Sequence, residues 1–161
     1  MAAVAGERRR CVVRAVVQRV SRAAVRVGSE VTGRVDTGLL VYAAAAPDDG
    51  PDDVRYIADK VAHLRIFNDA DDKMNLAVGD VGGAVLVVSA FTVLADARHG
   101  RRPSFESSAD GSTAAPLIEQ LVAELRGLGV TVETGRFAAR MQVPAVNEGP
   151  ICILLDSRRL L

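Results

Sequence analysis

The chain has 161 residues, a length typical of one domain, and 49% of them are hydrophobic, which is enough for a sizeable core. Its 20 basic residues balance its 20 acidic residues, and this net charge of zero argues against a protein that wraps a long nucleic acid, but not against contact with a short end of one. The two cysteines form neither a disulfide framework nor a zinc motif, and no apolar run reaches the roughly 18 residues of a membrane span, so we expect a cytoplasmic protein.

The first half of the chain predicts strands and then a helix. Residues 1–12 combine a short Ala-rich stretch with three consecutive arginines, and we expect them to form a flexible extension. Valine-rich segments, a Gly-Ser turn and an almost unbroken apolar run follow. After a Pro-rich turn, acidic residues suit the positive N-terminal end of a helix, and apolar residues then recur at helical spacing. The expected elements are strands over 12–27, 31–35 and 38–46 and a helix from Asp52 to Leu64.

The second half predicts more strands around a second helix. A glycine-rich turn at 79–83 is expected to join two strands as a hairpin, because it fits no phosphate-binding spacing. Thr113 is expected to cap the helix, with Pro116 in its first turn and Leu128 in its buried stripe. The expected strands are 74–78, 84–93, 130–134, 140–143 and 151–155, with a long polar loop over 98–112. This order predicts an α+β fold, one domain over 13–161 with a mixed, barrel-like sheet and two main helices.

Histidine and metal chemistry have little support. His63 falls inside the expected first helix and His99 in the polar loop, and neither has a second ligand at a useful spacing, so we predict no metal and no cofactor. The sequence also lacks the Gly-x-Ser-x-Gly motif of many serine hydrolases.

Three other segments are candidate functional sites. Two hydroxyl groups at the end of an apolar strand could bind or attack a carbonyl, or could simply bond to the backbone. Several arginines beside one phenylalanine suit a phosphate and a stacked base, but also suit a charged surface loop. A Gly-Pro pair between two apolar strands is either an ordinary turn or, with a cis bond, a rigid element of defined shape. These segments are Ser89-Ala90-Phe91-Thr92, 98–105 and Asn147-Glu148-Gly149-Pro150.

Segments along nearly the whole chain resemble D-aminoacyl-tRNA deacylases, and they follow the order of that family. The matching segments are 14–23, 38–41, 64–67, 73–76, 100–105, 132–137, 141–143 and the Asn-x-Gly-Pro of 147–150. Val13 stands where the family's first residue would be, so we expect the natural chain to begin there.

The resemblance implies a homodimer with two active sites at the subunit interface, acting without a metal on the acceptor end of aminoacyl-tRNA. The expected reaction is hydrolysis of the ester of D-aminoacyl-tRNA, and of glycine mischarged on tRNA-Ala. Gly149-Pro150 resembles the family's cross-subunit motif, which has a cis bond and excludes L-aminoacyl groups from the partner's pocket. Arg19 matches the arginine that braces this motif, and Met141 the methionine packed near it.

The same resemblance assigns the pocket itself. Ser89, Ala90, Phe91 and Thr92 match the catalytic motif, in which main-chain groups bind the aminoacyl group and the 2′-hydroxyl of the terminal adenosine assists the attack of water. Phe137 matches a residue beside that adenosine. Among the basic side chains, Arg98, Arg101 and Arg102 are expected to contact the tRNA.

The chain departs from the family pattern in three places, one of which is 43–46, where four alanines stand in place of a common Gly-containing segment. Ala90 stands where glutamine is usual, and Cys152 where threonine is usual. The change at Ala90 removes an amide, so two further hypotheses stay open: a non-catalytic RNA-binding module, and a conventional esterase that uses Ser89 or Thr92 as its nucleophile.

Overall fold

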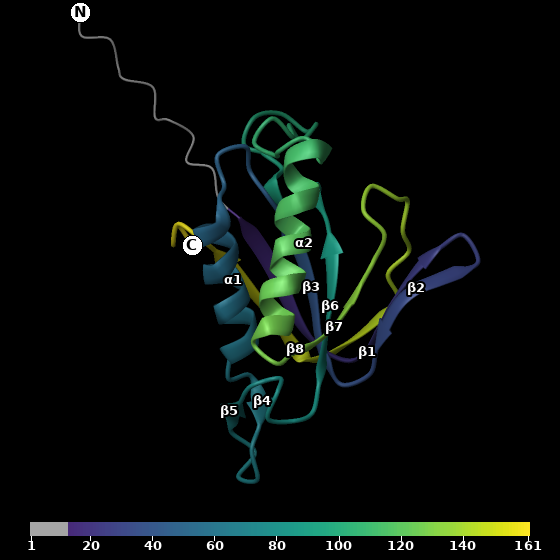
Figure 1. Ribbon diagram of the computed structural model, residues 1–161, viewed down its shortest axis with the longest axis vertical. Coiled ribbons are helices and arrows are strands. Elements are labelled where there is room, and N and C mark those ends of the chain that lie inside the picture. The colour runs from purple at the N-terminus through teal and green to yellow at the C-terminus, as the bar shows by residue number, and fades with distance from the viewer. Residues whose placement is uncertain (1–12) are drawn as a thin grey trace, which may run out of the picture.

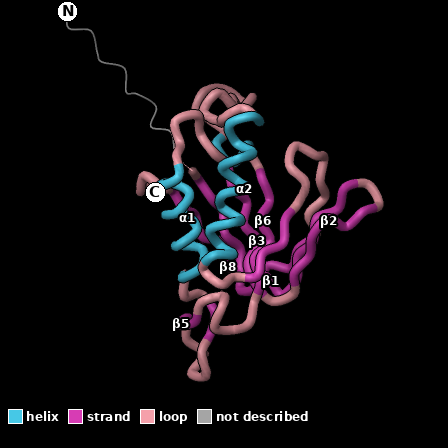
Figure 2. Tube along the Cα trace, viewed as in Figure 1, coloured by secondary structure: helices cyan, strands magenta, loops and turns pink. Residues whose placement is uncertain are grey.

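The computed structural model describes residues 13–161, so the expected N-terminal extension lies outside the described residues. Two helices lie side by side over one face of a twisted sheet (Figure 1 and Figure 2). The elements are β1 (Arg14–Val27), β2 (Glu30–Val35), β3 (Gly38–Ala44), α1 (Pro51–His63), β4 (Phe67–Asn68), β5 (Met74–Leu76), β6 (Ala84–Ser89), the 3-10 helix η1 (Phe91–Leu94), α2 (Gly111–Gly127), β7 (Thr131–Thr134) and β8 (Ala145–Asp156).

The main sheet is mixed and curls on itself, as the sequence predicted. Its strands follow the order β2-β1-β3-β6-β7, and β8 pairs with β1. Strands β3, β6 and β7 are parallel neighbours, whereas β1 is antiparallel to β2, β3 and β8. The long β1 pairs with β3 through Arg14–Val20 and with β2 through Ala23–Val27. Because of this extension of β1, β2 lies over one face of the sheet. There β2 approaches β7 so closely that a Cβ on Gly33 would lie 2.3 Å from the carbonyl oxygen of Thr134.

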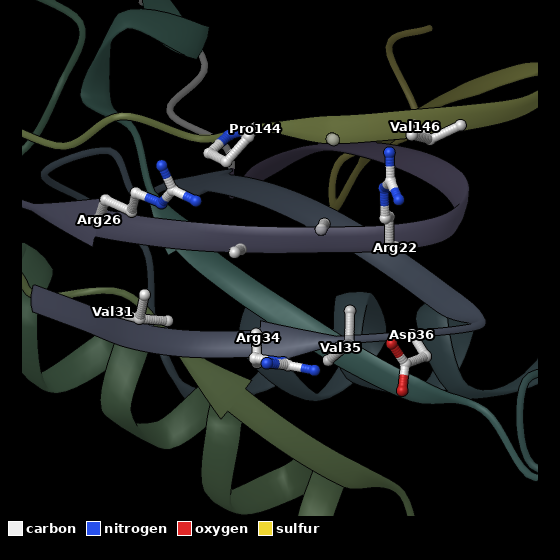
Figure 3. A pocket seen from close by; sticks show the side chains of 11 residues that line it. Arg22, Arg26, Val31, Arg34, Val35, Asp36, Pro144 and Val146 are labelled. Carbon is white, nitrogen blue, oxygen red and sulfur yellow. The ribbon is translucent and has the colours of Figure 1, made fainter.

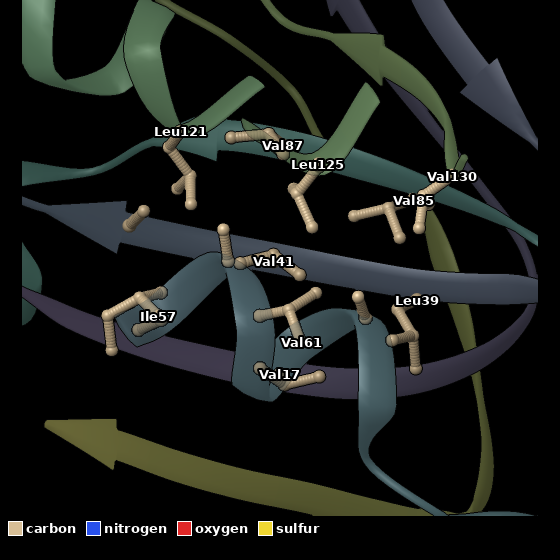
Figure 4. Close-up of a cluster of buried hydrophobic side chains, with 14 of the residues drawn as sticks. Val17, Leu39, Val41, Ile57, Val61, Val85, Val87, Leu121, Leu125 and Val130 are labelled. Carbon is tan, nitrogen blue, oxygen red and sulfur yellow. The ribbon is translucent and has the colours of Figure 1, made fainter. Parts of the chain in front are cut away.

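The core fills the space between the sheet and the helices (Figure 4). Alternate residues of β1, such as Ala15 and Val17, face the helices, and α1 contributes Ile57 and Val61 from one face. A smaller cluster on the opposite face of the sheet is covered by β2, and it includes Val25, Val35, Leu40, Leu86 and Val88. Neighbouring leucines of β3 therefore belong to different clusters, which explains why that strand is apolar on both faces.

The pairing of two strands differs from the prediction. β5 pairs with β4 in a small separate sheet, and β6 pairs in parallel with β3, so the expected hairpin across 79–83 is wrong. The continuously apolar β6 is buried in the main sheet, whereas Met74 of β5 is 59% exposed. The glycine-rich segment is a turn, but it connects two different sheets.

Several other details of the elements also differ from the prediction. β6 ends at Ser89, and the apolar residues after it form η1, in which Phe91 is exposed and Leu94 is buried. Asp110, not Thr113, caps α2, because its side chain accepts the Thr113 N–H, and Pro116 falls in the second turn. The stripe of α2 ends before Leu128, which is 47% exposed. The expected strand at 140–143 is reduced to one bridge between Gln142 and Arg26, while β8 begins earlier than expected and contains the Gly-Pro pair.

Candidate functional site

The Gly-Pro pair lies in a bulge of β8, which we call the Gly-Pro bulge (148–151). On β1, the residues that pair with Asn147 and Cys152 are separated by one residue, Arg19. On β8, four residues lie between Asn147 and Cys152, so residues 148–151 bulge out of the strand pairing. The Asn147 amide closes the bulge, because it accepts the Ile151 N–H at 3.0 Å and donates to the Ile151 carbonyl at 3.0 Å. The Gly149-Pro150 bond is cis, the geometry that the family resemblance implied, and both residues are exposed.

Gly149 occupies a conformation and a space that suit only glycine. Its φ is +128°, a region that L residues rarely adopt. A Cβ there would lie 2.8 Å from Cγ1 of Ile151 and 3.2 Å from Nη2 of Arg19. The bulge therefore has a defined backbone shape with no side chain at Gly149.

Arg19 holds the bulge from the neighbouring strand. Its Nε donates to the Glu148 carbonyl at 3.2 Å, and its Nη1 donates to the Ile66 carbonyl at 2.7 Å and to Oδ1 of Asn68 at 3.2 Å. One planar guanidinium thus links the bulge to the segment that leads into β4. These hydrogen bonds are the contacts that a bracing role for Arg19 would require, and the role itself stays a prediction.

The Ser-Thr segment (89–92) begins where β6 leaves the sheet. The Ala90 N–H donates to the Ala43 carbonyl at 2.9 Å, and the Phe91 carbonyl accepts the Ser108 hydroxyl at 2.9 Å. Beyond these bonds the chain turns into η1, where Phe91 is 55% exposed and Thr92 is also exposed. His63 lies in α1, with its Nδ1 2.9 Å from the Asp59 carbonyl, and no hydrogen bond joins either histidine to the hydroxyl of Ser89 or Thr92 within residues 13–161.

The basic loop (98–105) packs beside the Ser-Thr segment. The Phe105 ring contacts the Phe91 ring edge-on, with centroids 5.1 Å apart. Asp96 and Ser104 exchange two backbone hydrogen bonds of 2.8 Å at the base of the loop. Arg98 donates twice to the Asp96 carboxylate, at 2.9 Å and 2.7 Å, and these bonds hold the pKa of Asp96 well below its usual range. Arg101 and Arg102 are exposed on the same loop.

Phe137 and Met141 have separate surroundings. Phe137 is 38% exposed and lies near the start of α2, where its Cε1 would be 3.6 Å from a Cβ on Gly111. The sulfur of Met141 lies against Gly135, and its side chain packs on the smaller apolar cluster. Phe137 thus lies at the end of the sheet that carries the Ser-Thr segment, because the Gly135 N–H bonds to the Val87 carbonyl of β6.

The Gly-Pro bulge and the Ser-Thr segment do not meet within one chain. Ser89 pairs with Ala43 and is therefore level with Ala15 of β1, whereas the bulge is level with Arg19. Four residues along β1 and three strand spacings across the sheet separate them by on the order of 20 Å. The two segments therefore lie at opposite ends of the sheet, and we call them the candidate half-sites.

Sequence reasoning gave no role to Asn68 or to the Asn147 amide. Both fix the bulge, directly or through Arg19. The position of an asparagine four residues before Ile151, across a Gly-Pro pair, was the available signal for Asn147. The partner Asn68 could not be found in this way, because it is 49 residues from Arg19.

Two general features bear on the chemistry. In the part of the chain that the structure describes, no group of three or more His, Cys, Asp or Glu side chains could hold a metal ion. None of the helices over 13–161 combines the length and the apolar character needed to cross a membrane.

Comparisons with known proteins agree with one another. A family model described as D-Tyr-tRNA(Tyr) deacylase matches residues 16–156. A protein of Anaeromyxobacter dehalogenans (strain 2CP-C) named D-aminoacyl-tRNA deacylase is 61% identical over 91% of this chain and 99% of its own length. A protein of the same name from Syntrophobacter fumaroxidans is 51% identical over 91% of this chain and 99% of its own length.

Solved structures share the fold. One named c-Myc DNA Unwinding Element Binding Protein has a TM-score of 0.83 at 32% identity, and the match covers 88% of this chain and 97% of that one. Another, described as a probable eukaryotic D-amino acid tRNA deacylase, has a TM-score of 0.77 at 17% identity over 90% of this chain and 99% of that one.

Proposed function

The chain belongs to the D-Tyr-tRNA(Tyr) deacylase family, and from this membership we infer that it is a D-aminoacyl-tRNA deacylase, an ester hydrolase that frees D-amino acids from the 3′ end of tRNA. The observation that carries this inference is the 61% identity to a protein of that name over 91% of the chain. We place its action in the cytoplasm, where aminoacyl-tRNA is made.

The chemistry that we propose depends on main-chain groups of the Ser-Thr segment. An aminoacyl ester is already activated, so positioning of the carbonyl and of a water molecule can supply much of the rate. Phe91 and Thr92 are exposed residues whose carbonyls are already hydrogen-bonded, so their backbone N–H groups are the proposed donors to the aminoacyl group, while the 2′-hydroxyl of the terminal adenosine assists the water. Phe137, at the same end of the sheet, is the proposed neighbour of the adenosine. The main-chain role makes Ala90 compatible with activity, because alanine keeps the backbone N–H and carbonyl.

We propose that a second copy of the chain completes each site. The two half-sites lie on the order of 20 Å apart within one chain, which a two-fold dimer can bring together in pairs. β8 suits such an interface, because it is an edge strand with an exposed apolar residue, Leu154, at 56% exposure. The Gly-Pro bulge of one protomer would then enter the pocket of its partner.

In that arrangement the bulge acts by exclusion. Its rigid backbone would clash with the side chain of an L-aminoacyl group and leave room for the hydrogen on that side of a D-aminoacyl or glycyl group. Glycine mischarged on tRNA-Ala is therefore a proposed second substrate. Arg98, Arg101 and Arg102, which lie beside the Ser-Thr segment, are proposed contacts for the acceptor end.

The decisive experiment measures amino-acid release from D-tyrosyl-tRNA, L-tyrosyl-tRNA and glycyl-tRNA in the presence of a chelator. We expect hydrolysis of the D-tyrosyl and glycyl esters and little of the L-tyrosyl ester. Equal rates on the D and L esters would overturn the exclusion role of the bulge. Tight binding of aminoacyl-tRNA without hydrolysis of any ester would instead favour a non-catalytic RNA-binding module.

Two variants test the main-chain mechanism. Ser89→Ala and Thr92→Ala should each keep at least about a third of the wild-type kcat on D-tyrosyl-tRNA, because neither hydroxyl is the nucleophile. A reduction of about 10³-fold or more in either variant would support a side-chain nucleophile and contradict the proposal.

A further inference from the structure

A groove of about 400 Å³ runs over the outer surface of β1, β2 and the start of β8. Figure 3 shows its three strands, with Arg22 and Arg26 on β1, Arg34 and Asp36 on or just after β2, and Pro144 and Val146 on the third segment. We call it the arginine groove. It is distinct from both half-sites. Arg22 falls within the family-like segment 14–23, but no role was assigned to Arg22, Arg26 or Arg34 from the sequence.

The register of β1 and β2 places the three arginines on one surface. Arg22 and Arg26 are four residues apart on β1, so they point to the same side and their Cα atoms are about 13 Å apart. Ala24 lies between them and pairs with Arg34 of β2, which sets the third guanidinium opposite the gap. The small side chain of Ala24 leaves that gap open, while Ala23 and Val25 point into the apolar cluster beneath.

The charge of the groove is unbalanced. Three arginines face one acidic side chain, Asp36, in a protein whose net charge is zero. Within residues 13–161, no side chain or carbonyl accepts a hydrogen bond from the guanidinium of Arg22, Arg26 or Arg34. Other arginines, such as Arg14 and Arg136, are paired with carboxylates at 3.3 Å and 2.8 Å. Three free guanidinium groups in one groove suit an anion that carries several separated negative charges.

The surface between the arginines is apolar. Val31, on the β2 side of the groove, is 48% exposed, and Val146, on the β8 side, is 39% exposed; Pro144 also lines the groove on the β8 side. A small inorganic anion would leave these surfaces uncovered, whereas a phosphodiester chain carries sugars between its phosphates that could cover them. The combination of spaced cations and apolar gaps therefore fits a nucleic-acid backbone better than a free phosphate.

The arginine groove adjoins the Gly-Pro bulge. Arg22 pairs with Val146 on β8, and Val20 pairs with Asn147 at the edge of the bulge. In the proposed dimer, the Gly-Pro bulge of one protomer enters the pocket of its partner. The arginine groove of that same protomer then lies beside the pocket of the partner.

We infer that the arginine groove binds the phosphodiester backbone of the tRNA acceptor stem while the 3′ ester lies in the partner's pocket. The inference rests on the proposed function, and it assigns the backbone of the acceptor stem to one protomer, while its partner contacts the acceptor end and hydrolyses the ester.

The test compares a large and a small substrate. The variant is Arg22→Gln/Arg34→Gln, and the matched control is Arg55→Gln in α1, on the helix layer. We expect the double variant to lower kcat/KM on D-tyrosyl-tRNA about tenfold or more and to leave hydrolysis of D-tyrosyl-adenosine within about twofold of wild type, because the small ester has no stem. The control should behave as wild type on both. An equal reduction on both substrates, or no reduction on either, would overturn the inference.

Direct binding gives an independent readout. Affinity for uncharged tRNA, measured by fluorescence anisotropy across a salt series, should fall in the double variant, and the salt slope should be smaller by about one for each phosphate that the removed arginines had neutralised. An unchanged slope would overturn the inference, as would dissociation of the double variant into monomers in sedimentation, which would place the groove inside the subunit interface. If wild type binds tRNA with the steeper slope yet hydrolyses neither ester, the groove assignment stands and the proposed function fails.

Discussion

The backbone conformation of Gly149 sets the shape on which the proposed role of the Gly-Pro bulge depends. Gly149→Ala would force a Cβ into a backbone with φ of +128° and within 2.8 Å of Ile151. We expect this variant to remain folded, because the bulge is exposed, but to hydrolyse D-tyrosyl-tRNA at least about tenfold more slowly, because the bulge must move. Steady-state kinetics check this, with Gly79→Ala as the control, since Gly79 has open space around its Cβ position. Wild-type rates and wild-type D over L preference in Gly149→Ala would contradict the role of the bulge.

The half-buried carboxyl group of Asp49 should make the free energy of unfolding depend on pH. Burial raises the pKa of Asp49 to about 6, although its carboxylate accepts the Ala46 N–H. The native state then holds a proton that the unfolded chain releases near pH 4, so this group lowers stability as pH rises from about 4 to about 6.

Asp49→Asn removes that titration. We expect it to raise the free energy of unfolding by about 1 kcal/mol at pH 7, a value reduced from the full shift because the side chain is only half-buried, and to change little at pH 4. Urea unfolding at both pH values and one protein concentration checks this. A destabilised variant at pH 7 would show that the ionised carboxylate is favoured in the native state.

Helix α2 lacks one main-chain hydrogen bond, which a substitution should restore. Pro116 is its sixth residue and is exposed, and it has no N–H to donate to the Ser112 carbonyl one turn earlier. Pro116→Ala should restore that hydrogen bond and raise the free energy of unfolding by about 1–2 kcal/mol, after allowance for the greater freedom of the unfolded chain. Glu119→Ala, at another exposed position of α2, is the control. An unfolding midpoint at or below that of wild type would refute this prediction.

The closure of the sheet depends on the absence of a side chain at Gly33. A Cβ there would lie 2.3 Å from the Thr134 carbonyl oxygen and 3.2 Å from Cδ1 of Leu86. Gly33→Ala should separate β2 from β7 and cost about 2–4 kcal/mol, since backbone atoms cannot move as freely as a side chain. Chemical denaturation measures this cost, again against Gly79→Ala. A cost below about 0.5 kcal/mol would mean that β2 and β7 do not depend on this close approach.

Local sequence patterns predicted the individual helices and strands well, but they predicted poorly which strands pair with one another. β1, β3 and α1 were predicted because their apolar spacing is contained in consecutive residues. The sequence predicted that β5 pairs with β6, whereas it pairs with β4 through Phe67. The prediction was wrong because strand pairing is a contact between separate segments of the chain. Phe91 was assigned to a strand because it continues an apolar run, yet it packs on Phe105 of a distant loop.

The candidate site shows the same limit. Individual motifs, including Arg19 and the Gly-Pro pair, could be matched residue by residue to a family. The hydrogen bond from Arg19 to the Ile66 carbonyl and the separation of the two half-sites depend on strand register, which no single motif encodes. The arginine groove was missed for a related reason, because its members come from three strands.

At the scale of the whole molecule, the outer face of β8 should hold two copies together. Leu154 is 56% exposed on this edge strand, opposite Val16 of β1. Leu154→Lys should place a charge in the interface and shift sedimentation at micromolar concentration from dimer toward monomer, with a parallel fall in activity. Leu128→Lys, at the end of α2 with 47% exposure, is the control. A fully dimeric Leu154→Lys variant would place the interface elsewhere.

The distance between the Gly-Pro bulge and the Ser-Thr segment has a consequence for mixtures of damaged chains. When each site takes one half from either copy, a chain with a broken bulge and a chain with a broken pocket can rescue one another. Random exchange of two such inactive proteins should restore about a quarter of the wild-type sites, because half of the dimers are mixed and each mixed dimer has one intact site. A cell that carries the two defects on separate copies of the gene would then keep working enzyme, whereas a cell in which every copy carries both defects would have none.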